Sequence, residues 1–188
     1  MEEKENTYPR YFGEFYAANT DKFEKKKNNL MPKLYYAVAL IAIILVIFPA
    51  ILPMPSWLTR TIGVIVAIVA AYKGYMSSFD IINLRSGGKV KELGLKKFKR
   101  DETDINRILD AFLKKDFEYL SNLPGAYSAP VQLHIEEDAV GRELYCMLTT
   151  YKSDSEIVGL ADVLTLSGSD YDKYESEIKR MCKEEENN

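Results

Sequence analysis

Few side chains in this sequence are suited to nucleophilic, acid–base or metal chemistry. The 188 residues contain one histidine, His134, and two cysteines, Cys146 and Cys182, which lie thirty-six positions apart. Zinc sites and redox motifs use cysteine or histidine ligands only a few residues apart, and no such pair occurs here. We therefore expect no metal ion, no cofactor and no catalytic residue.

A cysteine nucleophile would need His134 within hydrogen-bonding distance of Cys146. Residues 131–136 alternate apolar and polar side chains, and a second strand is predicted from 143 to 151. The register that gives a wholly apolar inner face pairs Val131 with Leu148, Leu133 with Cys146 and Ile135 with Leu144. This register places Cys146 in the core and His134 on the other face, opposite Tyr145, so the two side chains should not meet.

The carboxylates and glycines do not form a recognisable catalytic motif either. Asp162 interrupts the apolar run 160–164 and is the most unusual carboxylate, although an outward-facing or edge-strand position would explain it. The glycines at 87, 88 and 168 lack the spacing and the lysine of a phosphate-binding loop. We expect the chain not to be an enzyme.

Two apolar stretches dominate the organisation of the chain. Residues 34–52 carry no charge, and as a helix they would extend about 28 Å, close to the hydrocarbon thickness of a bilayer. The proline-containing segment 53–56 separates them from a second apolar stretch, 57–76. The sequence therefore predicts a transmembrane helical hairpin over residues 33–76.

Basic residues flank only one side of this hairpin. They are Lys25, Lys26, Lys27 and Lys33 before it, and Lys89, Lys91, Lys96, Lys97, Lys99 and Arg100 after it. The positive-inside rule then places both termini in the cytoplasm, with the chain as a multi-pass protein of the inner (cytoplasmic) membrane. We expect these residues to contact the anionic headgroups of the lipid bilayer. Nucleic acid would attract the same charges, but their position beside the bilayer favours lipid, and no nucleic-acid partner is expected.

The second predicted span carries small residues at helical spacing. Gly63, Ala67, Ala71 and Gly74 form a candidate helix-packing face, because small side chains let helices approach closely in lipid. This face would serve either a homo-oligomer or packing against the first span. Arg60 and Lys73 lie near the two ends of the span, where long basic side chains reach the interface, although Arg60 could also line a pore.

The amino-terminal arm, residues 1–32, contains aromatic residues at helical spacing: Tyr8, Tyr11, Phe12, Phe15, Tyr16 and Phe23. They predict an amphipathic helix over 9–27. Its aromatic face would bind either the membrane interface or the folded domain.

Residues 77–100 would form a basic juxtamembrane connector. From position 85 onward this segment contains seven basic residues and one acidic residue.

Residues 101–188 carry nine basic and twenty acidic residues and should form a small cytoplasmic α+β domain. The predicted order is α-β-β-β-α with an antiparallel sheet: a helix over 101–123, the hairpin above, a third strand over 156–166, and a last helix from Ser169 or Asp170. Tyr171, Tyr174, Ile178 and Met181 would share one face of that helix. A sheet face left uncovered, with Tyr145, Met147 and Tyr151, would be a docking surface.

The expected function is a membrane-anchored, non-enzymatic interaction or regulatory module with a protein partner on the cytoplasmic side. Two alternatives remain: a membrane-perturbing effector or small channel assembled through the hairpin, and an immunity protein against a membrane-targeting toxin.

Overall fold

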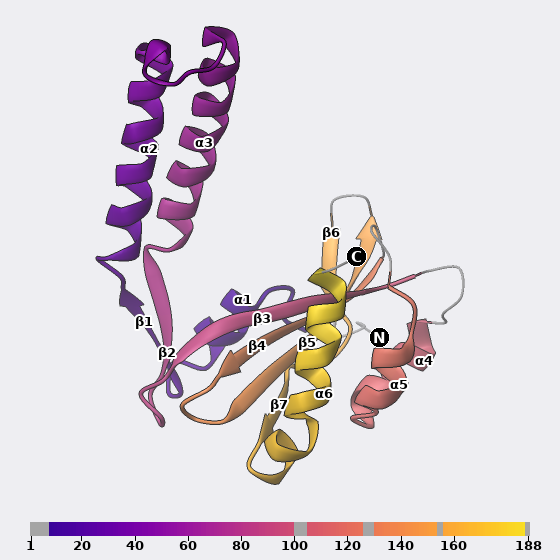
Figure 1. The fold of residues 1–188 in the computed structure, drawn as a ribbon. Coiled ribbons are helices and arrows are strands. Elements are labelled where there is room, and N and C mark those ends of the chain that lie inside the picture. Colours follow the sequence, from indigo (N-terminus) through magenta and orange to yellow (C-terminus); the bar gives the residue numbers. More distant parts are fainter. Residues whose placement is uncertain (1–7, 100–104, 126–129, 154–155, 187–188) are drawn as a thin grey trace. The chain divides into compact units, whose positions relative to one another are not determined.

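The computed structural model describes residues 8–99, 105–125, 130–153 and 156–186. Helices and strands alternate irregularly along the chain (Figure 1). In order they are α1 (Phe12–Ala18), β1 (Phe23–Lys27), α2 (Met31–Ile47), the 3-10 helix η1 (Pro49–Ile51), α3 (Ser56–Met76), β2 (Phe79–Asn83), β3 (Lys89–Phe98), α4 (Ile105–Leu113), α5 (Phe117–Asn122), β4 (Val131–Asp138), β5 (Glu143–Ser153), β6 (Glu156–Gly159), β7 (Leu164–Ser167) and α6 (Ser169–Glu186).

The chain forms two compact units, and the second is inserted into the first. Residues up to 24 and from 81 onward make the sheet unit, whereas residues 25–80 make the unit that contains α2 and α3. The links between the units run through β1 and β2, which are neighbours in one sheet. The helix pair thus occupies the position of the loop in a β-hairpin.

Backbone hydrogen bonds at both ends of β1 and β2 define their antiparallel pairing. The N–H of Leu84 donates to the carbonyl of Lys22 over 2.8 Å, and the N–H of Asn28 donates to the carbonyl of Ser78 over 2.9 Å. The seven-stranded antiparallel sheet continues in the order β1-β2-β3-β4-β5-β6, with β7 also paired to β5. The segment expected to be a basic connector is therefore largely strands β2 and β3, because its backbone pairs with neighbours on both sides.

The sheet is covered on both faces. One face packs against α4, α5 and α6, and its fully buried residues include Leu133, Cys146 and Ile178. The other face packs against α1, where Phe12 and Tyr16 from α1 and Phe23 from β1 form a buried cluster with Tyr145 and Met147. Tyr145 and Met147, expected on an uncovered docking surface, are only 1% and 2% exposed, whereas Tyr151 of that set is exposed.

The predicted helix over 9–27 is wrong in its extent. It ends at Ala18, and Phe23–Lys27 is a strand that pairs with β2. The aromatic face packs on the sheet, which is the second of the two expected roles. Tyr16 donates its hydroxyl hydrogen to Glu136 over 2.5 Å and so ties α1 to β4.

The β4–β5 register differs by two residues from the predicted one. Leu133 pairs with Leu148 and Ile135 with Cys146, while His134 lies opposite Met147. A shift of two keeps every side chain on its predicted face. In the observed register, the buried Asp138 carboxylate accepts the N–H groups of Val140 and Gly141 in the following loop.

Two other predicted elements are divided in the structure. The helix over 101–123 is replaced by α4 and α5, separated at Lys115, which adopts a left-handed conformation with φ 58°; residues 101–104 lie outside the described part. The third strand over 156–166 is divided into β6 and β7, and exposed Asp162 lies between them rather than in a strand. The last helix is confirmed, and Tyr171, Ile178 and Met181 are buried on one face of it.

The inserted unit is a pair of adjacent helices, α2 and α3 (Figure 1). Helix α2 ends at Ile47, earlier than the apolar stretch, because a proline follows at position 49 and helices usually end before the residue preceding a proline. Asn28 organises the base of the pair. Its side-chain oxygen accepts the N–H groups of Leu30 and Met31, and its amide donates to the Asp80 carboxylate over 3.1 Å.

The insertion can be tested by replacing residues 29–77 with the two-residue turn Asn-Gly. Asn28 and Ser78 already form the hydrogen bond that closes a hairpin, so the sheet unit should remain folded and monomeric without detergent. Circular dichroism and size-exclusion chromatography measure this. As a control, a chain that starts at Ile81 lacks α1 and β1, leaves Tyr145 and Met147 uncovered, and should aggregate. Equal behaviour of the two truncated chains would contradict the insertion.

The contact between α1 and the sheet predicts a pH-dependent loss of stability in Tyr16→Phe. Burial raises the pKa of Glu136, and the Tyr16 hydroxyl opposes that rise. Without the hydroxyl the folded-state pKa rises further, so the variant should lose about 1.5–3 kcal/mol where Glu136 is ionised. The folded-state pKa of Glu136 lies above the ordinary carboxyl value of 4.5 in both proteins and is higher in the variant, so the loss should be complete at pH values above both. It should shrink as the pH falls through these raised pKa values and be small at pH 4.5 and below.

Chemical denaturation of the two proteins at several pH values measures this effect. Tyr11→Phe is the matched control, because Tyr11 is 53% exposed and should tolerate the change at every pH. A loss in Tyr16→Phe that is independent of pH would show that the hydrogen bond to Glu136 does not cause it.

Candidate functional site

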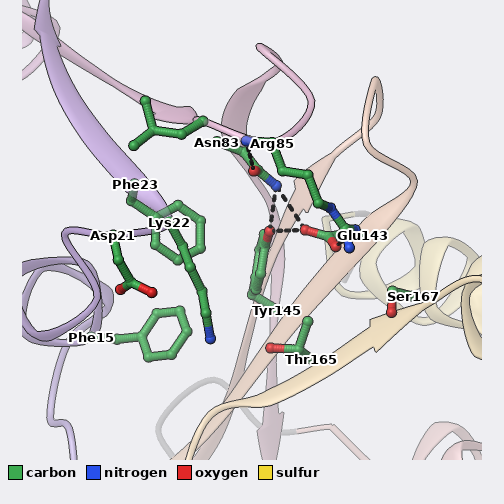
Figure 2. Close-up of a pocket in the computed structure, with 11 residues that line it drawn as sticks. Phe15, Asp21, Lys22, Phe23, Asn83, Arg85, Glu143, Tyr145, Thr165 and Ser167 are labelled. Carbon is green, nitrogen blue, oxygen red and sulfur yellow. Dashed lines mark hydrogen bonds and ion pairs between the residues drawn. The ribbon is translucent and has the colours of Figure 1, made fainter.

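A cavity of about 530 Å³ lies in the sheet unit, between α1 and β1 on one side and β5 and β7 on the other. Three aromatic side chains form much of its wall: Phe15 from α1, Phe23 from β1 and Tyr145 from β5 (Figure 2). Its other lining residues are polar, charged or aliphatic: Asp21, Lys22, Asn83, Leu84, Arg85, Glu143, Thr165 and Ser167. Segments far apart in the sequence therefore meet around one cavity.

Three buried polar side chains, Asn83, Glu143 and Tyr145, form a hydrogen-bonded group at this cavity (Figure 2). The Asn83 amide donates to Glu143 Oε2 over 2.7 Å and to the Tyr145 hydroxyl over 3.1 Å. Tyr145 in turn donates to Glu143 Oε2 over 2.5 Å. Burial, together with the Glu143 carboxylate, raises the pKa of Tyr145, so its phenol stays protonated.

Arg85 completes this arrangement from the rim of the cavity. Its guanidinium forms an ion pair with Glu143 Oε1, and its backbone N–H donates to Asn83 Oδ1 over 3.0 Å. The Glu143 carboxylate therefore receives donors from three side chains. It acts as a fixed acceptor that holds Asn83, Arg85 and Tyr145 in place.

The structure divides the ten predicted headgroup-binding residues between the two units. Lys25, Lys26, Lys27 and Lys33 belong to the unit with the helix pair, and all four are exposed. On β3, Lys91 is exposed whereas Lys89 and Lys97 are half-buried; Lys99, just beyond the strand, is exposed, and Arg100 lies outside the described residues. Lys96 is only 5% exposed. It pairs with Leu133, which places its side chain on the α6 side of the sheet, and its contact with lipid headgroups stays a prediction.

The predicted small-residue face is used mainly within the helix pair. A Cβ atom at Gly63 would lie 2.7 Å from Val46 Cγ2, and one at Gly74 would lie 2.9 Å from the Tyr36 ring. Gly63 and Gly74 are buried and Ala67 is half-buried, but Ala71 is exposed. Packing between α2 and α3 therefore accounts for Gly63 and Gly74.

Most apolar side chains of the helix pair face outward. Leu40, Ile41, Ile65 and Ile68 are all more than half exposed. By length and composition α3, with 21 residues, qualifies as a candidate membrane span in the described part of the chain, and α2 is a shorter apolar helix of 17 residues. A soluble core helix of this length would bury one face, whereas only 22% of the α3 apolar window is buried.

The residues first considered for catalysis lie apart. Cys146 is fully buried on the α6 side of β5, and burial raises the pKa of its thiol well above the usual range. His134 lies on the opposite face of the sheet, where burial lowers its pKa. Among the described residues, no three His, Cys, Asp or Glu side chains form a group that could hold a metal ion.

Sequence reasoning missed the cavity. Asn83 and Arg85 belong to the segment expected to be a connector, and Lys22 to the predicted helix, so no periodic pattern brought them together. The only local signal was the glycine pair at 87 and 88, which marks the turn between β2 and β3. Gly87 has φ 71° and donates its N–H to Asn83, and this fixes the position of the asparagine.

The packing of the helix pair predicts different effects for two matched substitutions in α3. Gly63→Val should destabilise the pair by about 1–3 kcal/mol, because the added side chain overlaps Val46 and the Ala42 carbonyl. Ala71→Val adds a similar side chain at an exposed position and should change stability little. Thermal unfolding in mild detergent, followed by circular dichroism, compares them. A larger effect at Ala71 would instead indicate that this residue packs against another copy of the chain.

No protein-family model matches the chain, and no curated protein or solved structure matches it. The interpretation of the cavity and of the helix pair therefore rests on their residues, contacts and exposure.

Proposed function

We propose that this chain is a membrane-anchored, non-enzymatic interaction or regulatory module, in which α2 and α3 cross the bilayer and the sheet unit acts at its cytoplasmic face. The observation that carries the proposal is the outward-facing apolar surface of the helix pair. Folded proteins in water rarely expose apolar patches larger than a few hundred Å². A bilayer removes this cost, because its hydrocarbon solvates the exposed side chains.

The helix lengths support two crossings. At about 1.5 Å rise per residue, the 21 residues of α3 extend about 31 Å and the 17 residues of α2 about 26 Å. Both lengths lie within the range of transmembrane helices. Apart from the first and last turns, the amides and carbonyls of each helix are satisfied internally, as a hydrocarbon environment requires.

The distribution of charge and aromatic residues within the helix unit supports the orientation. Lys33 and Lys73 lie toward the β1–β2 end of the pair, and three further lysines lie on β1. Arg60 is the only basic residue near the other end. Trp57 at the start of α3 is 69% exposed, and Tyr72 near its end is 61% exposed, as expected for aromatic side chains at the two interfaces.

The proposed role of the sheet unit is to bind a protein partner. The segment from residue 101 onward is strongly acidic, with twenty acidic and nine basic residues. Glu143 accepts hydrogen bonds from its neighbours, and Cys146 is fully buried. Neither side chain is free to react with a substrate, which favours binding over catalysis. Of the alternatives, a small channel would require several hairpins to assemble, and an immunity protein would require a toxin as its partner. The use of Gly63 and Gly74 within the chain argues for an anchor over an assembly.

The topology can be tested with single cysteines and a membrane-impermeant maleimide. Met54→Cys lies between the two helices and should react in intact cells, because the proposed orientation places it outside. Val140→Cys is the matched control: Val140 is 70% exposed in the β4–β5 loop and should react only after lysis. The native cysteines, both buried, should react in neither condition.

Three results would contradict parts of this proposal. Release of the chain from membranes by alkaline carbonate would exclude two spanning helices, and labelling of Val140→Cys in intact cells would reverse the orientation. Purification from solubilised membranes without a stoichiometric protein partner would remove the interaction role.

A further inference from the structure

The cavity in the sheet unit has the size and lining of a small-molecule site. Its volume of about 530 Å³ falls in the range of known ligand pockets, which are mostly apolar with a few fixed polar groups. The rings of Phe15, Phe23 and Tyr145 supply the apolar part (Figure 2). They also pack on one another, since Phe15 and Phe23 each contact Tyr145, so the apolar part is preformed.

Lys22 supplies a cation that the described residues do not neutralise. Its backbone is fixed by the β1–β2 pairing, because its carbonyl accepts the N–H of Leu84. Figure 2 shows the side chain extending past Phe23, so that the ammonium lies between Phe15 and Thr165. Within the described residues this ammonium has no hydrogen-bond or ion-pair partner. Lys22 is exposed, and an ammonium without a partner beside an aromatic cavity favours an anion there.

The other cation of the cavity, Arg85, does not compete for that anion. Arg85 and Glu143 neutralise each other in their ion pair. The Asp21 carboxylate also lines the cavity, and Figure 2 shows it beside the Phe15 ring. Thr165 and Ser167, exposed on β7, add hydroxyl donors opposite the lysine.

We propose that this cavity binds a small organic anion: a ring-sized apolar body held among Phe15, Phe23 and Tyr145, with a carboxylate or phosphate that contacts Lys22. The apolar body gains affinity by leaving water, and the charged group fixes its orientation through the ammonium and the β7 hydroxyls. This site is independent of the membrane anchor and of any protein partner. It adds a ligand to the function proposed above.

The test uses the full chain in nanodiscs of zwitterionic phosphatidylcholine, so that no anionic lipid competes. Ligand-observed NMR measures the affinities of phenyl phosphate and phenylacetate, which carry both parts of the proposed ligand. Benzyl alcohol lacks the charge, and inorganic phosphate lacks the ring. We expect both complete probes to bind about tenfold more tightly than either partial probe, the effect of one charge-assisted hydrogen bond or of a buried ring.

Matched lysine variants assign the binding to this cavity. Lys22→Gln should weaken the complete probes about tenfold and leave benzyl alcohol unchanged. Lys22→Arg keeps the charge and should retain binding, which also controls for folding. Lys26→Gln removes an exposed lysine four residues further along the chain, outside the cavity, and should have no effect.

Three outcomes would overturn the proposal. They are the absence of saturable binding by both complete probes, equal affinity for the complete and partial probes, and equal weakening by Lys22→Gln and Lys26→Gln. Tighter binding of phenyl phosphate than of phenylacetate, with the Lys22 dependence retained, would assign the anionic group as phosphate; the reverse order would assign it as carboxylate.

Discussion

The pairing of β1 with β2 is the interaction on which the rest of the structure depends. It brings the amino-terminal arm into a sheet whose other strands all come after residue 78. The same pairing fixes the ends of the intervening segment at Asn28 and Ser78, so α2 and α3 leave and return at one place. Without it, α1 would have no fixed position, and the face of β5 that carries Tyr145 would be uncovered.

The two units differ in whether they bury or expose their apolar side chains. The sheet unit buries apolar side chains on both faces of β5, so that alternating residues such as Leu144 and Tyr145 are equally inaccessible to water. The helix pair buries little beyond the residues between its two helices, and its stability depends on close approach at Gly63 and Gly74. One unit therefore creates its own apolar interior, whereas the other presents its apolar side chains to the surroundings.

Local patterns predicted the elements whose side chains carry a clear period. Helix α6 and the faces of β4 follow directly from sequence, because each buries a regular stripe of residues. Strands β1 and β3 could not be recognised. The first, Phe23–Lys27, consists of one aromatic and four charged residues, and the second has a bulge between Glu92 and Gly94 that breaks its alternation. Their strand character comes from neighbours distant in sequence. The cavity was missed for the same reason, since its asparagine lies at the end of β2 and its lysine directly precedes β1, and only pairing reveals these strands.

The separation between α1 and its binding surface has a consequence for synthesis. Tyr16 and Glu136 are 120 positions apart, and at typical rates of translation that interval takes on the order of ten seconds. During this time α1 has been made but β4 and β5 have not, and the apolar helix pair is produced in between. The aromatic side chains of α1 therefore cannot pack on β4 and β5 until after the helix pair has been synthesised. The sheet unit therefore closes late, after synthesis of the whole inserted segment is complete.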